Sequence, residues 1–295
     1  MKEYNTIILG AGISGISCAI YLKRAGINVL VIENNVPGGQ LNKIDIIENY
    51  PGYRLVQGVD LASNLLAQAE RCEIEFLFDE VKKIYFDKKI IYINEQAYSY
   101  QYLVFATGRR ERTLGLKNEA NWIGRGISLC ATCDGALYKD QDVIVVGGGN
   151  SAVSEAIYLS NICRKVYLIY RNENLRADKI LKTRLEQRNN IEVIYNGIVS
   201  EYLINNDKIG GVRLENGQDI NASCIFLAIG QIPNSELFDG EKENGYIIVD
   251  DYGKTSLNDV YACGDVILKE VYQLVTASSE GAIVATSIIK DSQGR

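Results

Sequence analysis

The stretch NTIILGAGISG, residues 5–15, decides the fold of this 295-residue chain. Its first five residues form a short apolar, β-branched run of the kind that becomes a buried parallel strand. Gly10, Gly12 and Gly15 follow, then a helix-like stretch, and then a second strand that ends at Glu33. This order of strand, glycine turn, helix and strand is the context that the dinucleotide-binding fingerprint requires.

The residues of the fingerprint have separate physical tasks. Gly10 permits a tight turn, Gly12 lets the backbone approach a pyrophosphate, and Gly15 allows the helix to pack on the strand. The N-terminus of the helix then faces the phosphates with its unpaired N–H groups. Glu33 stands where a carboxylate would accept hydrogen bonds from the hydroxyls of an adenosine ribose. The first unit therefore predicts a site for FAD or NAD.

The same plan recurs in the middle of the chain. DVIVV (142–146) is the strand, GGGNSA (147–152) is the turn and KVYLIY (165–170) is the second strand. This strand leads into Arg171, with Arg176 close by, where the first unit has a carboxylate. Arginines attract the 2′-phosphate that a carboxylate would repel, so the second unit predicts a site for NADPH. Glycine-rich turns in an ordinary α/β protein, the alternative, would not explain two such complete units.

Further helices and strands expected from the sequence complete the two α/β units. Helices are expected over 60–72 and 273–290, an antiparallel layer over 73–94, strands over 103–110 and 224–230, and a hairpin over 213–220 turned at Asn216-Gly217; VYACGD (260–265) precedes the last helix. Candidate linkers lie near 110–120 and 230–245. The predicted fold class is α/β, with two Rossmann-like three-layer nucleotide-binding domains, the second inserted into the first.

Composition excludes several classes of protein. The chain has 31 basic and 37 acidic residues, a net charge of −6 and no basic run, which argues against a nucleic-acid partner. No apolar stretch has the length and continuity of a transmembrane helix, and the N-terminus MKEYN lacks the features of a signal peptide. We therefore expect no membrane association and a cytoplasmic location, where thiols are kept reduced.

CATCDG, residues 130–135, places two cysteines three positions apart with an aspartate behind the second. The pair alone is compatible with a redox disulfide, half of a zinc site or two neighbouring thiols. The chain has seven cysteines, no second CxxC and no histidine, so a four-ligand zinc site lacks its ligands and no metal is expected. Without histidine, Asp134 is the available proton carrier beside the pair, although it is also a candidate helix N-cap.

The order and spacing of further motifs resemble the low-molecular-weight thioredoxin reductases, flavoproteins of the pyridine nucleotide-disulfide oxidoreductase class. These motifs run nearly end to end: GAGISG, PGGQL (37–41), ENYPG (48–52), ATG (106–108), CATCDG, GGGNSA, AIGQIPN (228–234), ACGD (262–265) and QLVTASSEG (273–281). The resemblance implies an FAD-binding domain of residues 1–112 and 240–295, and an NAD(P)H-binding domain of residues 113–239 that carries the CxxC. It also implies thioredoxin as the protein substrate, and a homodimer.

The resemblance further implies a set of site residues. Those toward FAD are Gly10, Gly12, Ser14, Gly15, Glu33, Gly39, Gln40, Asn49, Thr107, Gly108, Gly264, Asp265, Gln273 and Leu274. Those toward NADPH are Gly147, Gly149, Asn150, Ser151, Ala152, Arg171 and Arg176. Reduced flavin is anionic at its pyrimidine edge, and a helix N-terminus stabilises that charge, so the start of the last helix is expected there.

For the dithiol, the resemblance implies that Cys133 faces the flavin and receives its electrons. Cys130 is then the more exposed thiol, which attacks the disulfide of the substrate, and Asp134 exchanges the proton. In a single arrangement of the two domains, the nicotinamide and Cys133 cannot both reach the flavin while Cys130 reaches a protein substrate. The inserted domain is therefore expected to rotate about the two linkers.

Four positions in three motifs depart from the pattern of the resembled family. Asn172 and Tyr170 replace an arginine and a histidine of a basic HRRxxxR stretch, Tyr272 replaces an arginine, and Gln231 replaces a histidine. FAD binding is not removed by these changes, but the electron donor stays open between NADPH, NADH and ferredoxin. Relatives that use ferredoxin lack the GGGNSA turn, which is intact here. A dithiol oxidase and a flavin-bound redox sensor are further alternatives.

Overall fold

The computed structural model describes residues 1–44 and 46–294. The chain folds into two compact units, one made of residues 1–110 and 233–295 and the other of residues 111–232. The chain leaves the first unit within β9 (Arg109–Glu111) and returns to it within β18 (Gln231–Pro233).

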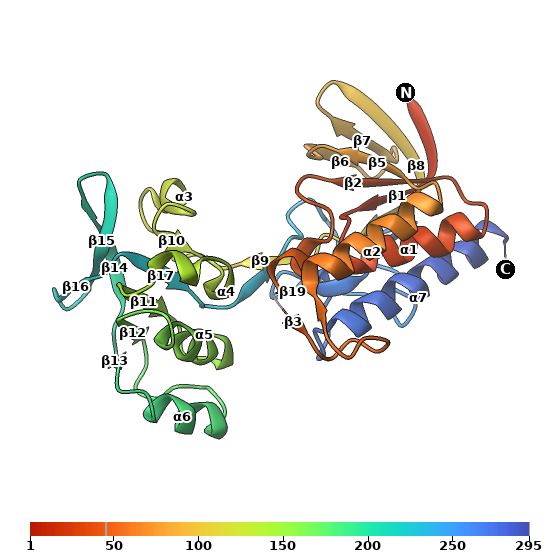
Figure 1. Cartoon of the computed structure of the whole chain (residues 1–295). Coiled ribbons are helices and arrows are strands. Elements are labelled where there is room, and N and C mark those ends of the chain that lie inside the picture. The colour runs from red at the N-terminus through yellow and green to blue at the C-terminus, as the bar shows by residue number, and fades with distance from the viewer. Residues whose placement is uncertain (45, 295) are drawn as a thin grey trace. The chain divides into compact units, whose positions relative to one another are not determined.

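The first unit is built on a seven-stranded sheet with the strand order β5-β2-β1-β8-β7-β6 (Figure 1), and β21 also pairs with β8. β1, β2, β5, β8 and β21 pair in parallel, whereas β6, β7 and the start of β8 form an antiparallel meander. The bounds of these strands are β1 (Lys2–Leu9), β2 (Val29–Glu33), β5 (Glu75–Phe78), β6 (Lys83–Tyr85), β7 (Ile90–Ile93), β8 (Gln96–Phe105) and β21 (Val260–Ala262).

Both faces of this sheet are buried, which explains why the last four residues of β1, Thr6–Leu9, are all buried instead of alternating between buried and exposed. Ile8 packs into a core under the helices, whereas Ile7 and Leu9 pack into a second core on the meander side, with Phe105 and Phe238. The helices of the first unit are α1 (Ile13–Arg24), α2 (Gly58–Arg71) and α7 (Leu274–Ser292). Short elements complete it: η1 (Gly39–Lys43), β3 (Ile46–Ile47), β4 (Val56–Gln57), β19 (Lys242–Glu243), β20 (Tyr246–Ile247) and η3 (Gly264–Val266).

The second unit repeats the plan with a five-stranded parallel sheet in the order β10-β17-β11-β12-β13. A three-stranded antiparallel sheet, β14-β15-β16, packs its apolar side on one face, and α5 covers the other. The strands are β10 (Ile127–Ser128), β11 (Asp142–Val146), β12 (Lys165–Tyr170), β13 (Ile191–Tyr195), β14 (Val199–Asn205), β15 (Lys208–Leu214), β16 (Asp219–Asn221) and β17 (Cys224–Leu227). The helices are α3 (Glu119–Trp122), α4 (Ala131–Asp134), η2 (Gly135–Tyr138), α5 (Asn150–Ser160) and α6 (Lys179–Glu186).

The prediction of an α/β fold with two Rossmann-like units, the second inserted into the first, is therefore confirmed. One local expectation was wrong in part. Residues 75–78 were assigned to an antiparallel layer, but β5 joins the main sheet in parallel with β2. The alternation of this segment did not distinguish the two, because a strand at the edge of a parallel sheet is also half exposed.

The expected linker near 110–120 also has more structure than a linker needs. Leu114 and Leu116 pack against the core of the second unit. The buried carboxylate of Glu119 accepts hydrogen bonds from the N–H groups of Leu114 and Gly115, at 2.9 and 2.7 Å, and from the hydroxyl of Tyr202. This segment is thus fixed to the second unit.

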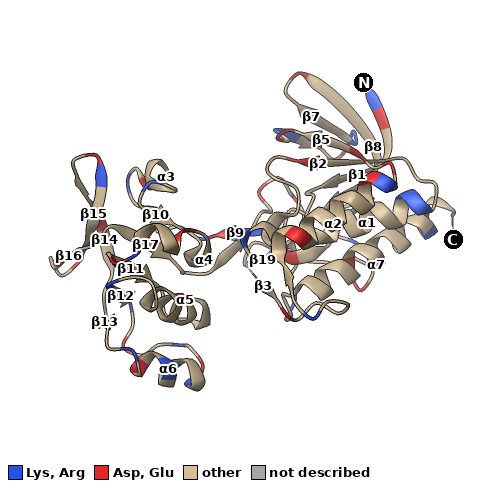
Figure 2. Cartoon of the chain, in the orientation of Figure 1, with Lys and Arg blue, Asp and Glu red and all other residues tan. Residues whose placement is uncertain are grey.

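Charged residues are interspersed along the ribbon, and Figure 2 shows no continuous basic stripe in this view. Among the described residues, no helix has the length and apolar character needed to cross a membrane.

The contact between α1 and α7 depends on glycine. A Cβ at Gly281 of α7 would overlap the carbonyl oxygen of Ser14 on α1. We expect Gly281→Val to lower the free energy of unfolding by about 1–3 kcal/mol, because the added methyl groups force the helices apart. Urea-induced unfolding measures this loss. Ser279→Ala, at an exposed position of the same helix, is the matched control, and equal stability of both variants would contradict the packing argument.

Candidate active site

The glycine turn of the first unit lies between β1 and α1. Gly10 has a φ of 105°, and a Cβ there would overlap the carbonyl oxygen of Ala106 at the end of β8. Gly12 is the N-cap of α1, and nothing lies within 4 Å of the position of a Cβ on it. A Cβ on Gly15 would overlap the carbonyl oxygen of Gly10. The backbone at Gly12 is thus open to a ligand, beside the unpaired N–H groups of a helix start.

Glu33 lies at the end of β2 and is buried. One carboxylate oxygen accepts a hydrogen bond from the N–H of Ala11 at 2.8 Å, and the other accepts one from Asn35, also at 2.8 Å. The carboxylate is therefore fixed against the glycine turn and keeps further acceptor capacity for a ligand hydroxyl.

The other predicted residues of the first unit gather from four segments. Gly39 lies against Gly12, and Gly264 lies against Ser14. Asn49 donates a hydrogen bond to the side chain of Gln273 at 3.0 Å, and Gln273 is the N-cap of α7. The remaining contacts join the ATG turn to the rest: Thr107 donates to the carbonyl of Asn234 at 2.6 Å, Gly108 accepts from the N–H of Asn234 at 3.0 Å, and Gln40 donates to the carbonyl of Arg109 at 2.7 Å. Leu274 packs into the small core beside α2.

Asp265 takes part in a charge cluster that the motifs did not reveal. Its carboxylate pairs with the guanidinium of Arg109 at 3.0 Å and with the ammonium of Lys269 at 3.4 Å. Lys269 in turn pairs with Glu280 at 2.8 Å, and Glu280 accepts the N–H of Gly264 at 2.9 Å. Sequence analysis missed Arg109 because it follows the ATG motif without belonging to it.

The second glycine turn repeats the geometry of the first. Gly147 has a φ of 147°, and a Cβ there would overlap the carbonyl oxygen of Ala228 at the end of β17. Gly149 is the N-cap of α5, again with nothing within 4 Å of a Cβ position. Ala152 is buried under the turn, and Ser151 is exposed beside it. The side chain of Asn150 donates to the carboxylate of Asp178 at 2.9 Å.

The ribose end of this turn contains the departures from the family pattern. The ring of Tyr170 lies beneath Gly148, where a Cβ would overlap it. The amide of Asn172 donates to the hydroxyl of Tyr170 at 3.0 Å, so its side chain is held locally. Arg171 and Arg176 are exposed, and the N–H of Arg176 donates to the carbonyl of Gly148 at 2.7 Å. Two exposed arginines thus lie beside the second glycine turn.

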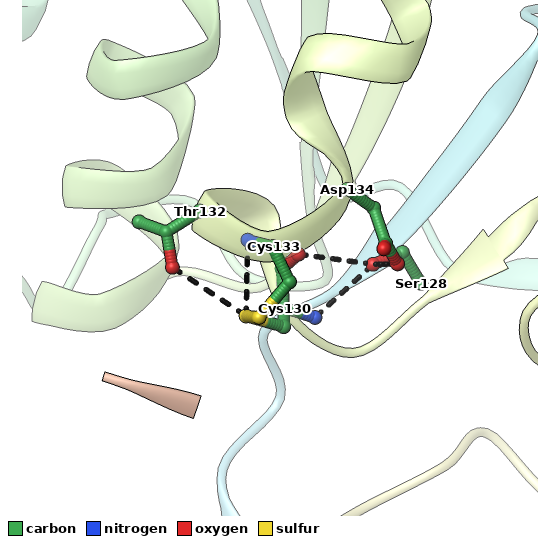
Figure 3. The surroundings of a disulfide bond; sticks show 5 residues. All are labelled: Ser128, Cys130, Thr132, Cys133 and Asp134. Atoms are coloured by element: carbon green, nitrogen blue, oxygen red, sulfur yellow. Dashed lines mark hydrogen bonds between the residues drawn. A yellow bond between two sulfur atoms is a disulfide. The ribbon is translucent and has the colours of Figure 1, made fainter. Parts of the chain in front are cut away.

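Cys130 and Cys133 form a disulfide at the start of α4, with their Cα atoms 5.3 Å apart (Figure 3). Cys130 is the N-cap. Its sulfur accepts the N–H of Cys133 at 3.2 Å and contacts the hydroxyl of Thr132 at 3.4 Å. Cys133 is exposed and Cys130 is half-buried, the reverse of the expected order.

Asp134 is tied to the disulfide through Ser128 (Figure 3). The hydroxyl of Ser128 donates to the carboxylate of Asp134 at 2.7 Å and accepts the N–H of Cys130 at 3.1 Å. The helix start is capped by Cys130, and the side chain of Asp134 makes no cap hydrogen bond. The hydroxyl of Ser128 thus links the carboxylate of Asp134 to the backbone of Cys130.

The structure separates the disulfide from the glycine turn within the second unit. Gly135, two residues after Cys133, packs against Leu159 near the end of α5. Gly149 caps the opposite end of that helix, about 14 Å away along its axis. The described residues contain no group of three or more cysteine, aspartate or glutamate side chains suited to a metal ion.

Four of the other cysteines are buried and are poor nucleophiles. Burial raises the pKa of Cys163 to about 11 and that of Cys224 to about 12. The same cause raises the pKa of Cys263 to about 12 and that of Cys18 well above its ordinary value. Thiolates form least readily at such sites, so these cysteines act as apolar filler.

Comparisons with known proteins agree with this fold and with the position of the disulfide in the sequence motifs. The model of the pyridine nucleotide-disulphide oxidoreductase family matches residues 4–282, so the chain belongs to this family. The predicted resemblance to the thioredoxin reductases is also confirmed. That of Bacillus subtilis (strain 168) is 33% identical over 97% of this chain and 94% of its own length.

Solved structures extend this likeness to the fold. The thioredoxin reductase of Lactococcus lactis has a TM-score of 0.87 and 32% identity, and the match covers 99% of this chain and all of that one. The ferredoxin-flavin thioredoxin reductase of Clostridium acetobutylicum has a TM-score of 0.56 and 26% identity over the whole of both chains.

Glu155 on α5 is a second residue that sequence analysis missed. Burial, together with the nearby Glu111, raises its pKa from 4.5 to about 7. One of its carboxylate oxygens is buried without a hydrogen-bond partner among the described residues. One signal could have revealed it: Glu155 is an acidic residue in an apolar stretch of the predicted helix.

The raised pKa of Glu155 predicts a pH-dependent stability. The folded state holds a proton between pH 4.5 and 7 that the unfolded state does not, so stability falls as the pH rises from 4.5 to 7 and levels off above 7. We expect Glu155→Gln to raise the free energy of unfolding at pH 8 by about 1–3 kcal/mol and to leave it unchanged near pH 4.5. Urea unfolding across this pH range is the measurement. Glu173→Gln, at an exposed carboxylate, is the control, and a gain independent of pH would contradict the assignment.

Proposed function

We propose that this protein is a thioredoxin-disulfide reductase that uses FAD and takes its electrons from NADPH. The observation that carries the proposal is the Cys130–Cys133 disulfide at a helix start, in a chain that also contains two open glycine turns. Membership of the pyridine nucleotide-disulphide oxidoreductase family supports a flavin and a nicotinamide cofactor.

The residues of the first unit fit FAD. Glu33 is presented to a ribose, the start of α1 to a pyrophosphate, and Gln273 at the start of α7 to the flavin. Among the described residues, the buried Nε of Arg109 has no hydrogen-bond partner, and the buried Oδ1 of Asp265 has only an ion pair with Lys269 at 3.4 Å. Unpaired groups of this kind are costly and are expected where a polar ligand completes a site. Bound FAD would supply the two-electron chemistry that links a hydride donor to a disulfide.

The dithiol performs the exchange with the substrate. The Cys130 thiolate attacks a sulfur of the substrate disulfide, whose S–S bond breaks as a mixed disulfide forms and one substrate thiolate leaves. Cys133 then attacks the sulfur of Cys130, which re-forms the internal disulfide and releases the second substrate thiolate. The two leaving thiolates each take up one proton.

Local hydrogen bonds favour Cys130 as the attacking thiol. Its sulfur has two donors, the N–H of Cys133 and the hydroxyl of Thr132. Hydrogen bonds to the charged form lower a thiol pKa, so negative charge is favoured on Cys130 after reduction. Asp134, linked to the pair through Ser128, is the proton carrier for the leaving thiolates.

The second unit is assigned to the nicotinamide donor. Gly147, Gly149 and the start of α5 would hold the pyrophosphate, and Arg171 with Arg176 would hold the 2′-phosphate. Rotation of this unit would bring the nicotinamide and the disulfide to the flavin in turn. We further propose a homodimer that works in the cytoplasm, where a reduced thiol pool is maintained.

A second candidate changes only the donor, to NADH or ferredoxin. The observation in its favour is Asn172, whose side chain is engaged with Tyr170 and is not an arginine. The ferredoxin-flavin thioredoxin reductase described above shares the fold. Two exposed arginines beside an intact glycine turn favour NADPH.

Cys130→Ser tests the central step. A serine hydroxyl does not attack a disulfide at neutral pH, so thioredoxin-coupled disulfide reduction should fall at least about a hundred-fold. Bleaching of the flavin band by NADPH should persist, because the nicotinamide site is untouched. Cys72→Ser, at a half-buried thiol outside the pair, should keep full activity. Retained thioredoxin reduction in Cys130→Ser would disprove the proposed function.

The donor is tested by anaerobic bleaching of the flavin band with NADPH and with NADH. We expect NADPH to reduce the flavin faster, and Asn172→Arg to increase that preference about ten-fold through one more charged contact to the 2′-phosphate. Asn174→Arg adds the same charge two residues away and should not change the preference. Reduction by ferredoxin but by neither nicotinamide would establish the second candidate.

A further inference from the structure

The side chain of Arg109 lies near the start of α7, although the two are far apart in the sequence. It follows the ATG turn at the end of β8, and Gln40 fixes its carbonyl group. Its guanidinium lies 4.1 Å from the ring centroid of Tyr272 and pairs with Asp265. The side chain is only 17% exposed. A guanidinium held by a ring face and a carboxylate has one fixed position.

Tyr272 holds the guanidinium next to the N-cap of α7. It immediately precedes Gln273, the N-cap residue, and its ring also contacts Tyr246 with centroids 5.6 Å apart. Sequence analysis left this tyrosine unexplained, because the family pattern has an arginine there. The structure places an arginine at the same point from position 109.

We propose that Arg109 is the cationic flavin-binding residue of this chain, supplying from the ATG turn the guanidinium that position 272 lacks. The inference rests on the proposed FAD site. It assigns to Arg109 two effects: a contact that strengthens FAD binding, and a positive charge that stabilises the reduced, anionic flavin and raises its midpoint potential.

The hydrogen bonds of the cluster favour Arg109 over Lys269 for this task. The ammonium of Lys269 is bonded to both carboxylate oxygens of Glu280, at 2.9 and 2.8 Å, and is 11% exposed. Arg109 has five N–H donors, of which one is bonded to Asp265. Its buried Nε has no partner among the described residues. Donor capacity thus remains on the arginine.

Arg110, the neighbour of Arg109, already makes the contacts that hold this turn in place. Arg110 bonds to the side chain of Asn234 at 2.6 Å and to Glu236 at 2.5 Å, and it is exposed. It therefore secures the same turn on the same unit without reaching the start of α7. Arg110→Met is for this reason a matched control for Arg109→Met.

The test measures FAD affinity and flavin potential on the whole protein. FAD is titrated into the apoprotein by fluorescence, and the midpoint potential of the loaded protein is obtained by anaerobic redox titration. Arg109→Met should weaken FAD binding about ten-fold or more and make the potential more negative, since a charge-assisted contact is lost. Arg110→Met should change neither value. Adding Tyr272→Arg to Arg109→Met should restore both.

Several results would overturn the inference. Arg109→Met with the affinity and potential of the wild type would do so, while leaving the FAD proposal intact. Equal losses in Arg110→Met, or no recovery when Tyr272→Arg is added, would reduce Arg109 to a structural role. A wild-type protein that binds no FAD would instead disprove the proposed function. If Arg109→Met does not fold, Arg109→Gln is used, because glutamine keeps polar donors but lacks the charge. Wild-type affinity and potential in that variant contradict the inference.

Discussion

The structure depends on one close approach, made once in each unit, between a glycine and the carbonyl oxygen at the end of a neighbouring strand. Gly10 meets Ala106 in this way, and Gly147 meets Ala228. A side chain at either glycine would push the turn off the sheet edge. The helix start would then lose its place above the carboxyl ends of the parallel strands, where ligands of such sheets bind.

From this constraint follows the division of chemistry along the chain. Each unit offers an open helix start, and the residue at its ribose end sets the charge: a buried carboxylate at Glu33, and exposed arginines at 171 and 176. The disulfide lies apart from the second turn, on its own short helix, where the sulfur of Cys130 accepts the N–H of Cys133. Buried thiols elsewhere have raised pKa values and do not compete with it.

The Arg109–Tyr272 contact shows that one fold can place a guanidinium at the same point from different sequence positions. The guanidinium and the ring are 163 positions apart in sequence, yet they stack at the start of α7. A comparison of motifs shows only that Tyr272 replaces an arginine. The tertiary structure brings Arg109 there because β8 ends, and α7 begins, at the same edge of the first unit.

The sequence by itself determined the two nucleotide-binding units, their order and the redox pair, because these depend on local patterns: glycine spacing, apolar runs and CxxC. It did not determine that β5 joins the main sheet, that a carboxylate oxygen of Glu155 is buried, or that Arg109 meets Asp265 and Tyr272. Sheet partners, desolvation and long-range ion pairs are settled only when distant segments pack together, since each is a property of the neighbours a residue acquires.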